Sequence, residues 1–129
     1  MAHYVNACTT PDDRVLALGY IPELFYLSHR RFAAGSVWLQ PKFFDTVADQ
    51  RLMIDRIVRY RVPIAVTVPE PEYTTEYVSD FPLLTKMLET DYELIGTIDF
   101  GRGFRFRILA RRGLAAARTY PFAGLPCFL

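Results

Sequence analysis

Short apolar runs alternate with amphipathic stretches along this chain, which predicts strands and helices in turn. Apolar runs bounded by turn residues are typical of buried strands, and apolar positions three or four residues apart are typical of helices. Strands are expected at residues 14–19, 36–39, 63–68, 93–99 and 104–111. Helices are expected at residues 22–31, 47–61 and 82–91, and residues 72–81 are expected to be partly helical.

This order of elements predicts an α/β fold, namely a three-layer Rossmann-like sandwich with a mostly parallel sheet. Because helices separate the strands, the first four strands are expected to be parallel. The fifth strand is expected to be antiparallel, in a C-terminal hairpin with its turn at residues 100–103. Its alternating pattern is typical of a strand with one wetter face. We interpret the basic stripe of Arg102, Arg105 and Arg107 as an edge guarded by charge.

The helix expected at residues 47–61 has its own pattern of apolar positions. Val47, Ile54, Ile57 and Val58 recur at near-helical spacing and predict the buried face. Thr46, three residues before Asp49, resembles a capping box with Asp in the usual place of Glu. The sequence therefore predicts that this helix begins directly after Thr46.

Length and composition predict a single α/β domain over residues 1–129, with a lead-in at 1–13 and an extended tail at 113–129. Hydrophobic residues make up 51% of the chain, which excludes a disordered chain. The net charge of +1 gives no global field that would attract nucleic acid, so no nucleic-acid partner is expected. No apolar run reaches the roughly 18–20 residues of a membrane span, so the isolated chain is expected to be soluble.

The two cysteines, Cys8 and Cys127, lie near opposite ends of the chain, without the spacing of a metal site. Two unpaired thiols are the expected state. Pairing stays open as the alternative, because the termini of α/β domains often lie close together. By loop entropy a disulfide here would contribute up to about 4–5 kcal/mol.

The first strand, turn and helix look like the opening unit of a Rossmann-like sheet, without the features of a nucleotide site. A dinucleotide-binding turn needs several glycines, whereas only Gly19 is present. Pro22 has no N–H to offer, and Glu23 places a negative charge where a phosphate would lie. No nucleotide or other cofactor is therefore expected.

Ligands of open α/β sheets bind outside the carboxyl ends of the strands, so residues 19–23 and 69–73 are expected to line one rim. Arg30 and Arg31 are candidates to lie near it. A solvated acidic loop is the alternative interpretation of the cluster that Glu76 completes. The predicted ligand-binding residues are Tyr20, Glu23, Glu70, Glu72 and Tyr73.

No residue stands out as a catalytic group or metal ligand. Asp12 and Asp13 are adjacent carboxylates, but they follow Thr-Pro and are interpreted as part of a turn. His29 lies near a helix end without a Ser, Cys or Asp at a motif-like distance, and is interpreted as a solvated or capping residue.

Several blocks of the chain, in order, resemble the C-terminal soluble region of bacterial polytopic membrane proteins. Those proteins are glycosyltransferase-like and belong to the class that uses polyprenyl-phosphate sugars as donors. The blocks are residues 8–16 (CTTPDDRVL), 22–35 (PELFYLSHRRFAAG), 49–52 (DQRL), 62–64 (VPI), 81–92 (from FPLL to Tyr92) and 125–128 (LPCF). The match covers most of the chain.

The resemblance implies a globular tail on the extracytoplasmic side, whose partner is the membrane-spanning part of its own full-length protein. It also implies a role in binding the acceptor or the lipid-linked sugar donor, or in capping the membrane part. Catalytic acids of that class lie in a loop near the first membrane spans. No segment here corresponds to that loop, so no catalytic residue carries over.

Two hypotheses follow from the sequence. The first is a non-catalytic extracytoplasmic accessory domain of a membrane glycosyltransferase-like protein. The alternative is a free-standing small α/β module that binds a ligand or a protein. An upstream run of apolar 20-residue segments in the reading frame would favour the first.

Overall fold

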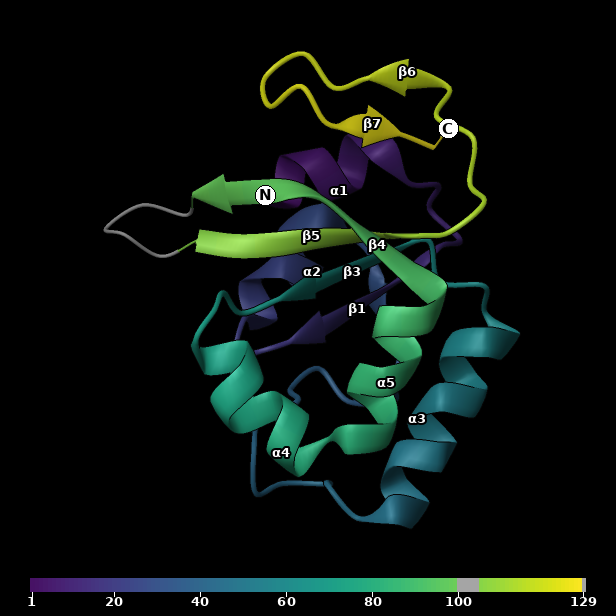
Figure 1. Ribbon diagram of the computed structural model, residues 1–129. Coiled ribbons are helices and arrows are strands. Elements are labelled where there is room, and N and C mark those ends of the chain that lie inside the picture. The colour runs from purple at the N-terminus through teal and green to yellow at the C-terminus, as the bar shows by residue number, and fades with distance from the viewer. Residues whose placement is uncertain (100–104, 129) are drawn as a thin grey trace.

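A mixed sheet of five strands forms the centre of the computed structural model, which describes residues 1–99 and 105–128 (Figure 1). The strand order is β2-β1-β3-β5-β4. The strands are β1 (Arg14–Leu18), β2 (Arg31–Phe32), β3 (Ile64–Thr67), β4 (Tyr92–Asp99) and β5 (Arg105–Arg111). A second, two-stranded sheet consists of β6 (Arg118–Thr119) and β7 (Pro126–Cys127).

Helices cover both faces of the central sheet (Figure 1). They are α1 (Ala2–Cys8), α2 (Pro22–Ser28), α3 (Val47–Arg59), the π-helix η1 (Tyr73–Tyr77), α4 (Val78–Asp80) and α5 (Pro82–Asp91). Helices α1 and α2 pack on one face together with β7, and α3, η1 and α5 pack on the other. The lead-in at residues 1–13 thus contains a helix, and the tail contains β6 and β7. None of the helices within the described ranges is both long and apolar enough to cross a membrane.

The prediction of a mostly parallel, Rossmann-like sheet is wrong. Strand β1 pairs in parallel with β2 and β3, but β5 pairs antiparallel with both β3 and β4. The hairpin strand β5 inserts between β3 and β4, because its Ile108, Leu109 and Ala110 are buried and suit a central position.

This strand order also corrects the interpretation of the basic stripe. Arg105 and Arg107 lie on an internal strand, not on a charged edge. Arg102, Phe104 and the predicted turn at 100–103 lie outside the described residues. The predicted antiparallel hairpin of the last two strands is confirmed by the pairing of β4 with β5.

The second predicted strand, at residues 36–39, is also wrong. Helix α2 ends at Ser28 rather than near Arg31, because His29 adopts the left-handed conformation at φ 54° and caps it. The chain then pairs with β1 through Arg31–Phe32, and the 36–39 segment contributes only an isolated bridge between Leu39 and Gly19. The strands predicted at 14–19 and 63–68 and the helix predicted at 82–91 are confirmed to within one residue.

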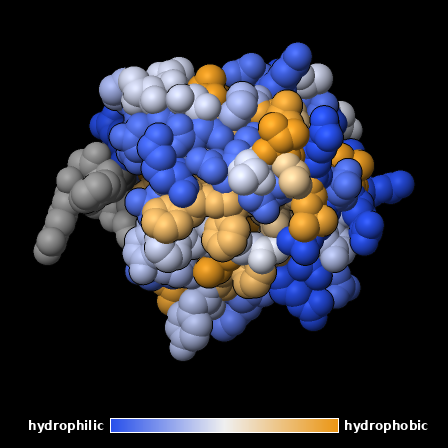
Figure 2. All heavy atoms as spheres, turned by 90° about the horizontal axis from the view of Figure 1, so that it is seen from below, coloured by the Kyte–Doolittle hydropathy of each residue, from blue (hydrophilic) through white to orange (hydrophobic). Residues whose placement is uncertain are grey.

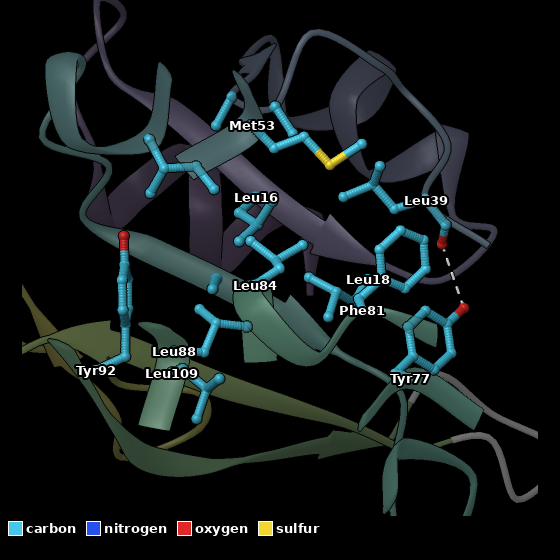
Figure 3. Packing of buried hydrophobic residues seen from close by; sticks show 14 of the residues in the cluster. Leu16, Leu18, Leu39, Met53, Tyr77, Phe81, Leu84, Leu88, Tyr92 and Leu109 are labelled. Carbon is cyan, nitrogen blue, oxygen red and sulfur yellow. Dashed lines mark hydrogen bonds between the residues drawn. The ribbon is translucent and has the colours of Figure 1, made fainter. Parts of the chain in front are cut away.

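Alternating side chains of the central strands build a core on each face of the sheet. Leu16 and Leu18 point to the side of α3 and α5, whereas Val15 and Ala17 point to the side of α1 and α2. Figure 3 shows the first of these cores, where the Tyr77 hydroxyl donates to the Leu39 carbonyl at 3.3 Å. Burial raises the pKa of Tyr77, so its phenol stays protonated at neutral pH.

Helix α3 begins after Thr46, whose hydroxyl accepts from the amide of Asp49, as the capping pattern predicts. Its predicted buried face is only partly right. Ile57 is buried, but Val47 and Val58 are about half exposed, and the polar Gln50 is buried in their place.

Gln50 is buried because it caps a neighbouring helix. Its Oε1 accepts from the amides of Leu83 and Leu84 at 2.9 and 3.2 Å, in the first turn of α5. Its Nε2 donates to the carbonyls of Asp45 at 2.7 Å and Asp80 at 3.3 Å. The N-terminal amides of a helix have no partner within the helix, so this side chain replaces a local cap.

Replacing Gln50 by leucine is expected to lower the free energy of unfolding by about 2–3 kcal/mol, because the amides of Leu83 and Leu84 stay buried without an acceptor. Urea denaturation followed by circular dichroism measures it. The control is Arg51→Ala on the exposed side of the same helix, which should stay within about 0.5 kcal/mol of the wild type. Equal effects of the two substitutions would contradict the capping role.

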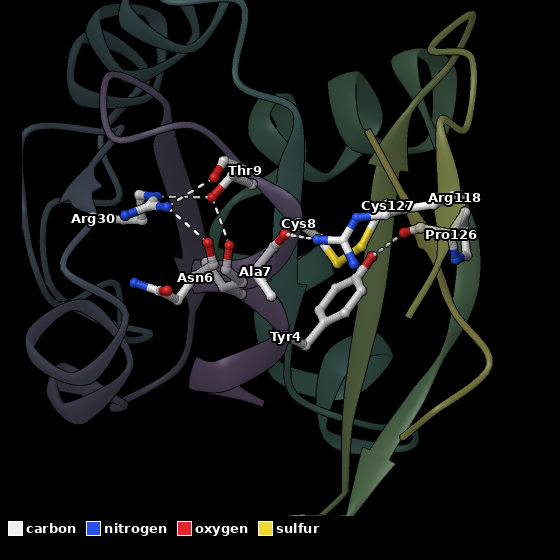
Figure 4. Close-up of a disulfide and its surroundings, with 10 residues drawn as sticks. Tyr4, Asn6, Ala7, Cys8, Thr9, Arg30, Arg118, Pro126 and Cys127 are labelled. Atoms are coloured by element: carbon white, nitrogen blue, oxygen red, sulfur yellow. Dashed lines mark hydrogen bonds between the residues drawn. A yellow bond between two sulfur atoms is a disulfide. The ribbon is translucent and has the colours of Figure 1, made fainter. Parts of the chain in front are cut away.

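The two chain ends lie on one face of the sheet and are covalently joined (Figure 4). Cys8 and Cys127 form a disulfide with their Cα atoms 4.4 Å apart, so the expectation of two unpaired thiols is wrong. The reason is that residues 2–8 form a helix that packs against α2 and β7, which places Cys8 beside the C-terminal segment. The Tyr4 hydroxyl adds a hydrogen bond to the Pro126 carbonyl at 2.7 Å.

Candidate functional site

The carboxyl ends of β1 and β3 do meet, since the Val68 amide donates to the Leu18 carbonyl at 3.1 Å. Of the predicted site residues, Tyr20, Glu23 and Glu72 do not share a pocket with the other two. Tyr20 is 67% exposed and meets the ring of Trp38 edge-on. Glu23 is exposed in the first turn of α2. Glu72 is exposed as well. Its pKa is raised mainly because neighbouring atoms remove part of its contact with water, and to a lesser extent because the negative charge of Glu76 lies near it.

Tyr20 belongs to a run of exposed aromatic side chains. Its ring lies 5.3 Å from that of Trp38, which in turn lies 5.5 Å from that of Phe43. Trp38 is fixed by a hydrogen bond from its Nε1 to the Oε1 of Gln40 at 2.7 Å. The segment that leads into α3 runs along the bottom of Figure 1, and Figure 2, seen from below, shows apolar side chains gathered there among polar ones.

Arg30 and Arg31 do not lie near the predicted rim. Arg31 pairs with Arg14, the first residue of β1, and so lies at the amino-terminal end of that strand, whereas the predicted rim lies at its carboxyl end.

Asp13 closes the 10–13 turn, where its carboxylate accepts from the Thr10 amide at 2.6 Å. His29 is the exposed cap of α2. Asp13 and His29 therefore have local structural roles.

Glu70 and Tyr73 come together in a pocket of about 300 Å³, which we call the β5 pocket. Arg107 reaches it because β5 pairs with β3 in a register that sets Arg107 opposite Thr67, just before the segment of Glu70. The full lining is Glu70, Tyr73, Thr74, Leu88, Glu89, Tyr92, Glu93, Leu94, Arg107, Leu109 and Arg112.

Ion pairs organise the two basic residues of the β5 pocket. The Nη1 of Arg107 lies 3.2 Å from the Oε1 of Glu70, and its guanidinium lies 4.8 Å from the centre of the Tyr73 ring. The other Glu70 oxygen accepts from the Thr74 hydroxyl at 2.7 Å. Arg112 lies 3.8 Å from Glu93. The ion pair between Glu70 and Arg107 is thus held by two neighbouring side chains, those of Tyr73 and Thr74.

Tyr73 is the buried polar residue of the β5 pocket. The residue is 5% exposed, and its hydroxyl, which is not itself fully buried, forms no hydrogen bond with any residue that the structure describes. Burial raises its pKa to about 12, while the charge of Arg107 lowers it and those of Glu89 and Glu70 raise it. The hydroxyl is therefore a protonated donor at neutral pH, surrounded by charged groups of the pocket.

Tyr92 contributes to the pocket in a different way. Its hydroxyl already donates to the Val62 carbonyl at 2.7 Å, and burial raises its pKa. Leu88 and Leu109 lie beside it in the core, as Figure 3 shows. The pocket therefore combines an apolar floor with charged walls and one unpartnered phenol.

This arrangement can bind a small polar ligand through hydrogen bonds and ion pairs. Residues 1–99 and 105–128 contain no group of three or more His, Cys, Asp or Glu side chains that could hold a metal ion.

Comparisons of the chain with protein-family models, curated proteins and solved structures gave no match.

Sequence reasoning identified two residues of this pocket and missed the rest. Glu89, Tyr92, Glu93 and Arg112 carried no recognisable motif, and Arg107 was assigned to an edge. The one available signal was the apolar Ile108-Leu109-Ala110 run, which favours a central strand over an edge strand for the segment that carries Arg107.

Proposed function

We propose that this chain is a non-catalytic extracytoplasmic accessory domain of a bacterial membrane glycosyltransferase-like protein. In this proposal it binds a sugar, free or lipid-linked, in the β5 pocket, and its partner is the membrane-spanning part of its own full-length protein. The ordered sequence blocks described above support the family assignment. The alternative is a free-standing α/β module that uses the same pocket.

The disulfide supports the extracytoplasmic placement. Cys8 and Cys127 are both fully buried in the core on the α1 side of the sheet. Disulfides form and persist in oxidising compartments, and they are rare where thiols are kept reduced.

The observation that carries sugar binding is the unpartnered hydroxyl of Tyr73, which belongs to a side chain that is 5% exposed and lines the pocket. Because the ring is held in place by burial, a ligand can bond to this hydroxyl without ordering the side chain first, and so gains affinity. Around it, carboxylates accept and guanidinium groups donate, while Leu88, Leu94 and Leu109 offer apolar contacts. A sugar has hydroxyl groups that both donate and accept, and apolar C–H faces, so it matches each part of this lining.

Binding is favoured over catalysis by the state of the polar groups. The Tyr73 phenol, with a pKa of about 12, is a poor general base at neutral pH. Glu70 is held by Arg107 and Thr74, and Glu93 lies near Arg112. These contacts suit a rigid recognition site more than proton transfer to a substrate.

An NMR titration of the purified chain tests sugar binding. Methyl glucoside and glucose 1-phosphate are expected to shift the backbone amides of Tyr73, Glu89 and Arg107 before those around Tyr20. Tyr73→Phe should weaken binding about tenfold, because only the hydroxyl is lost. Tyr20→Phe is the matched control and should leave affinity unchanged.

Two outcomes would contradict this function. Shifts confined to the Tyr20–Trp38 surface would move the site away from the β5 pocket. Absence of binding by either sugar, while farnesyl phosphate binds, would show recognition of the lipid phosphate in place of the sugar.

A further inference from the structure

The charges of the β5 pocket do not balance. Two of its three carboxylates, Glu70 and Glu93, are paired with Arg107 and Arg112. The third, Glu89, forms no ion pair with any residue in the described parts of the chain. The pocket is therefore left with one uncompensated negative charge.

The position of Glu89 adds to this negative potential. It lies in the last turn of α5, where backbone carbonyl groups carry partial negative charge and where no basic residue is present. Three of the last four carbonyl groups have donors, since that of Leu88 accepts from the Tyr92 amide and those of Thr90 and Asp91 accept from the Nε of Arg112 at 3.1 Å and from its amide at 2.8 Å. The helix end therefore adds only a small part of the negative potential, and the Glu89 carboxylate supplies most of it.

A second, independent observation points to a ligand at the same place. The Tyr73 side chain is more than nine-tenths buried, lines the pocket and leaves its hydroxyl without a hydrogen-bond partner among the described residues. Glu89 is among the charges that act on that hydroxyl. The unpaired carboxylate and the unpartnered phenol thus face the same space.

We propose that the β5 pocket selects a sugar that carries a protonated primary amine. This inference rests on the proposed sugar-binding function and names its ligand class. The ammonium group forms an ion pair with the Glu89 carboxylate, and the Tyr73 hydroxyl bonds to the sugar beside it. The Glu70–Arg107 pair stays intact and binds the remaining hydroxyl groups.

Three methyl glycosides with the same ring test the inference. Methyl glucosaminide carries the amine, methyl N-acetylglucosaminide carries it as a neutral amide, and methyl glucoside has a hydroxyl in its place. Mildly acidic conditions keep the amine protonated, and low salt limits the screening of its ion pair with Glu89. The first glycoside is expected to bind about tenfold tighter than the other two, as measured by NMR titration.

Glu89→Gln is the decisive variant, because it keeps the shape of the side chain and removes its charge. It should abolish the preference for the amine, so that methyl glucosaminide and methyl glucoside bind the variant with equal affinity. Glu89 is exposed, so the variant should fold, and a thermal melt checks this. Glu76→Gln removes an exposed acid outside the pocket and should preserve the preference.

The outcomes separate this inference from the proposed function. Equal binding of the three glycosides, or a preference that survives Glu89→Gln, overturns the amine inference and leaves sugar binding standing. Absence of binding by all three overturns both. The methylamide of Nα-acetyllysine is the last probe. If it binds as tightly as methyl glucosaminide, the pocket recognises an amine in general, and the assignment to a sugar is wrong.

Discussion

Replacing Cys8 and Cys127 together by alanine is expected to lower the free energy of unfolding by about 4–5 kcal/mol. The disulfide joins residues 119 positions apart and so closes a loop over nearly the whole chain. A loop of this length restricts the unfolded chain strongly, and its loss increases the entropy of the unfolded state. Domains are typically stable by only about 5–15 kcal/mol, so this loss is a large fraction of the total.

Urea denaturation of the oxidised wild type and of the Cys8→Ala/Cys127→Ala variant measures the difference. A reducing agent should move the unfolding midpoint of the wild type toward that of the variant and leave the variant unchanged. The prediction fails if mass spectrometry shows free thiols in the treated wild type while its midpoint stays where it was.

Local pattern was enough to predict the elements with the strongest signals. The β1 and β3 strands are continuous apolar runs, buried on both faces, and Pro82 marks the start of α5. The end of α2 was predicted too late, because a left-handed His29 carries little signal in a single sequence. Strand order was the main error, since pairing of β5 with β3 joins residues about 40 positions apart.

The same limit applies to the candidate site. The rule that ligands bind at the carboxyl ends of strands led to Glu70 and Tyr73, which line the β5 pocket. It could not supply Arg107, because that residue reaches the pocket only through the antiparallel pairing of β5 with β3. Tyr20, placed on the same rim by the same rule, instead packs against Trp38.

Arg30 shows a further interaction that the pattern does not reveal. The sequence places it near the end of a helix and as a candidate to lie near the predicted rim, but it is buried at 7% exposure, without a carboxylate partner among the described residues. Its guanidinium donates to the Thr9 hydroxyl and carbonyl at 2.8 and 2.7 Å and to the Asn6 carbonyl at 2.8 Å (Figure 4). It also donates to the carbonyls of Ser28 and His29 at 3.1 and 3.3 Å.

These acceptors explain how a buried cation is tolerated. They lie at the C-terminal ends of α1 and α2, where unpaired carbonyl groups carry partial negative charge. One planar side chain with five N–H donors satisfies both helix ends and joins them. Arg30 and the disulfide therefore anchor the same helix, α1, from opposite sides.

Arg30→Met is expected to lower the free energy of unfolding by about 3–4 kcal/mol, because it keeps the apolar stem and leaves several buried carbonyl groups without donors. Arg30→Lys should recover only part of this, since an ammonium group has three donors and no planar fork. Arg31→Met is the matched control at the exposed neighbouring position and should change stability by less than about 0.5 kcal/mol. Urea denaturation of the three variants measures these differences.

The cost of Arg30→Met should not simply add to that of removing the disulfide, because both changes release α1. In the Cys8→Ala/Cys127→Ala background, α1 is already less firmly held, so the further loss caused by Arg30→Met is expected to be smaller. Full additivity would show that the two anchors act independently. Equal effects of Arg30→Met and Arg31→Met in the wild-type background would show that the buried hydrogen bonds contribute little to stability.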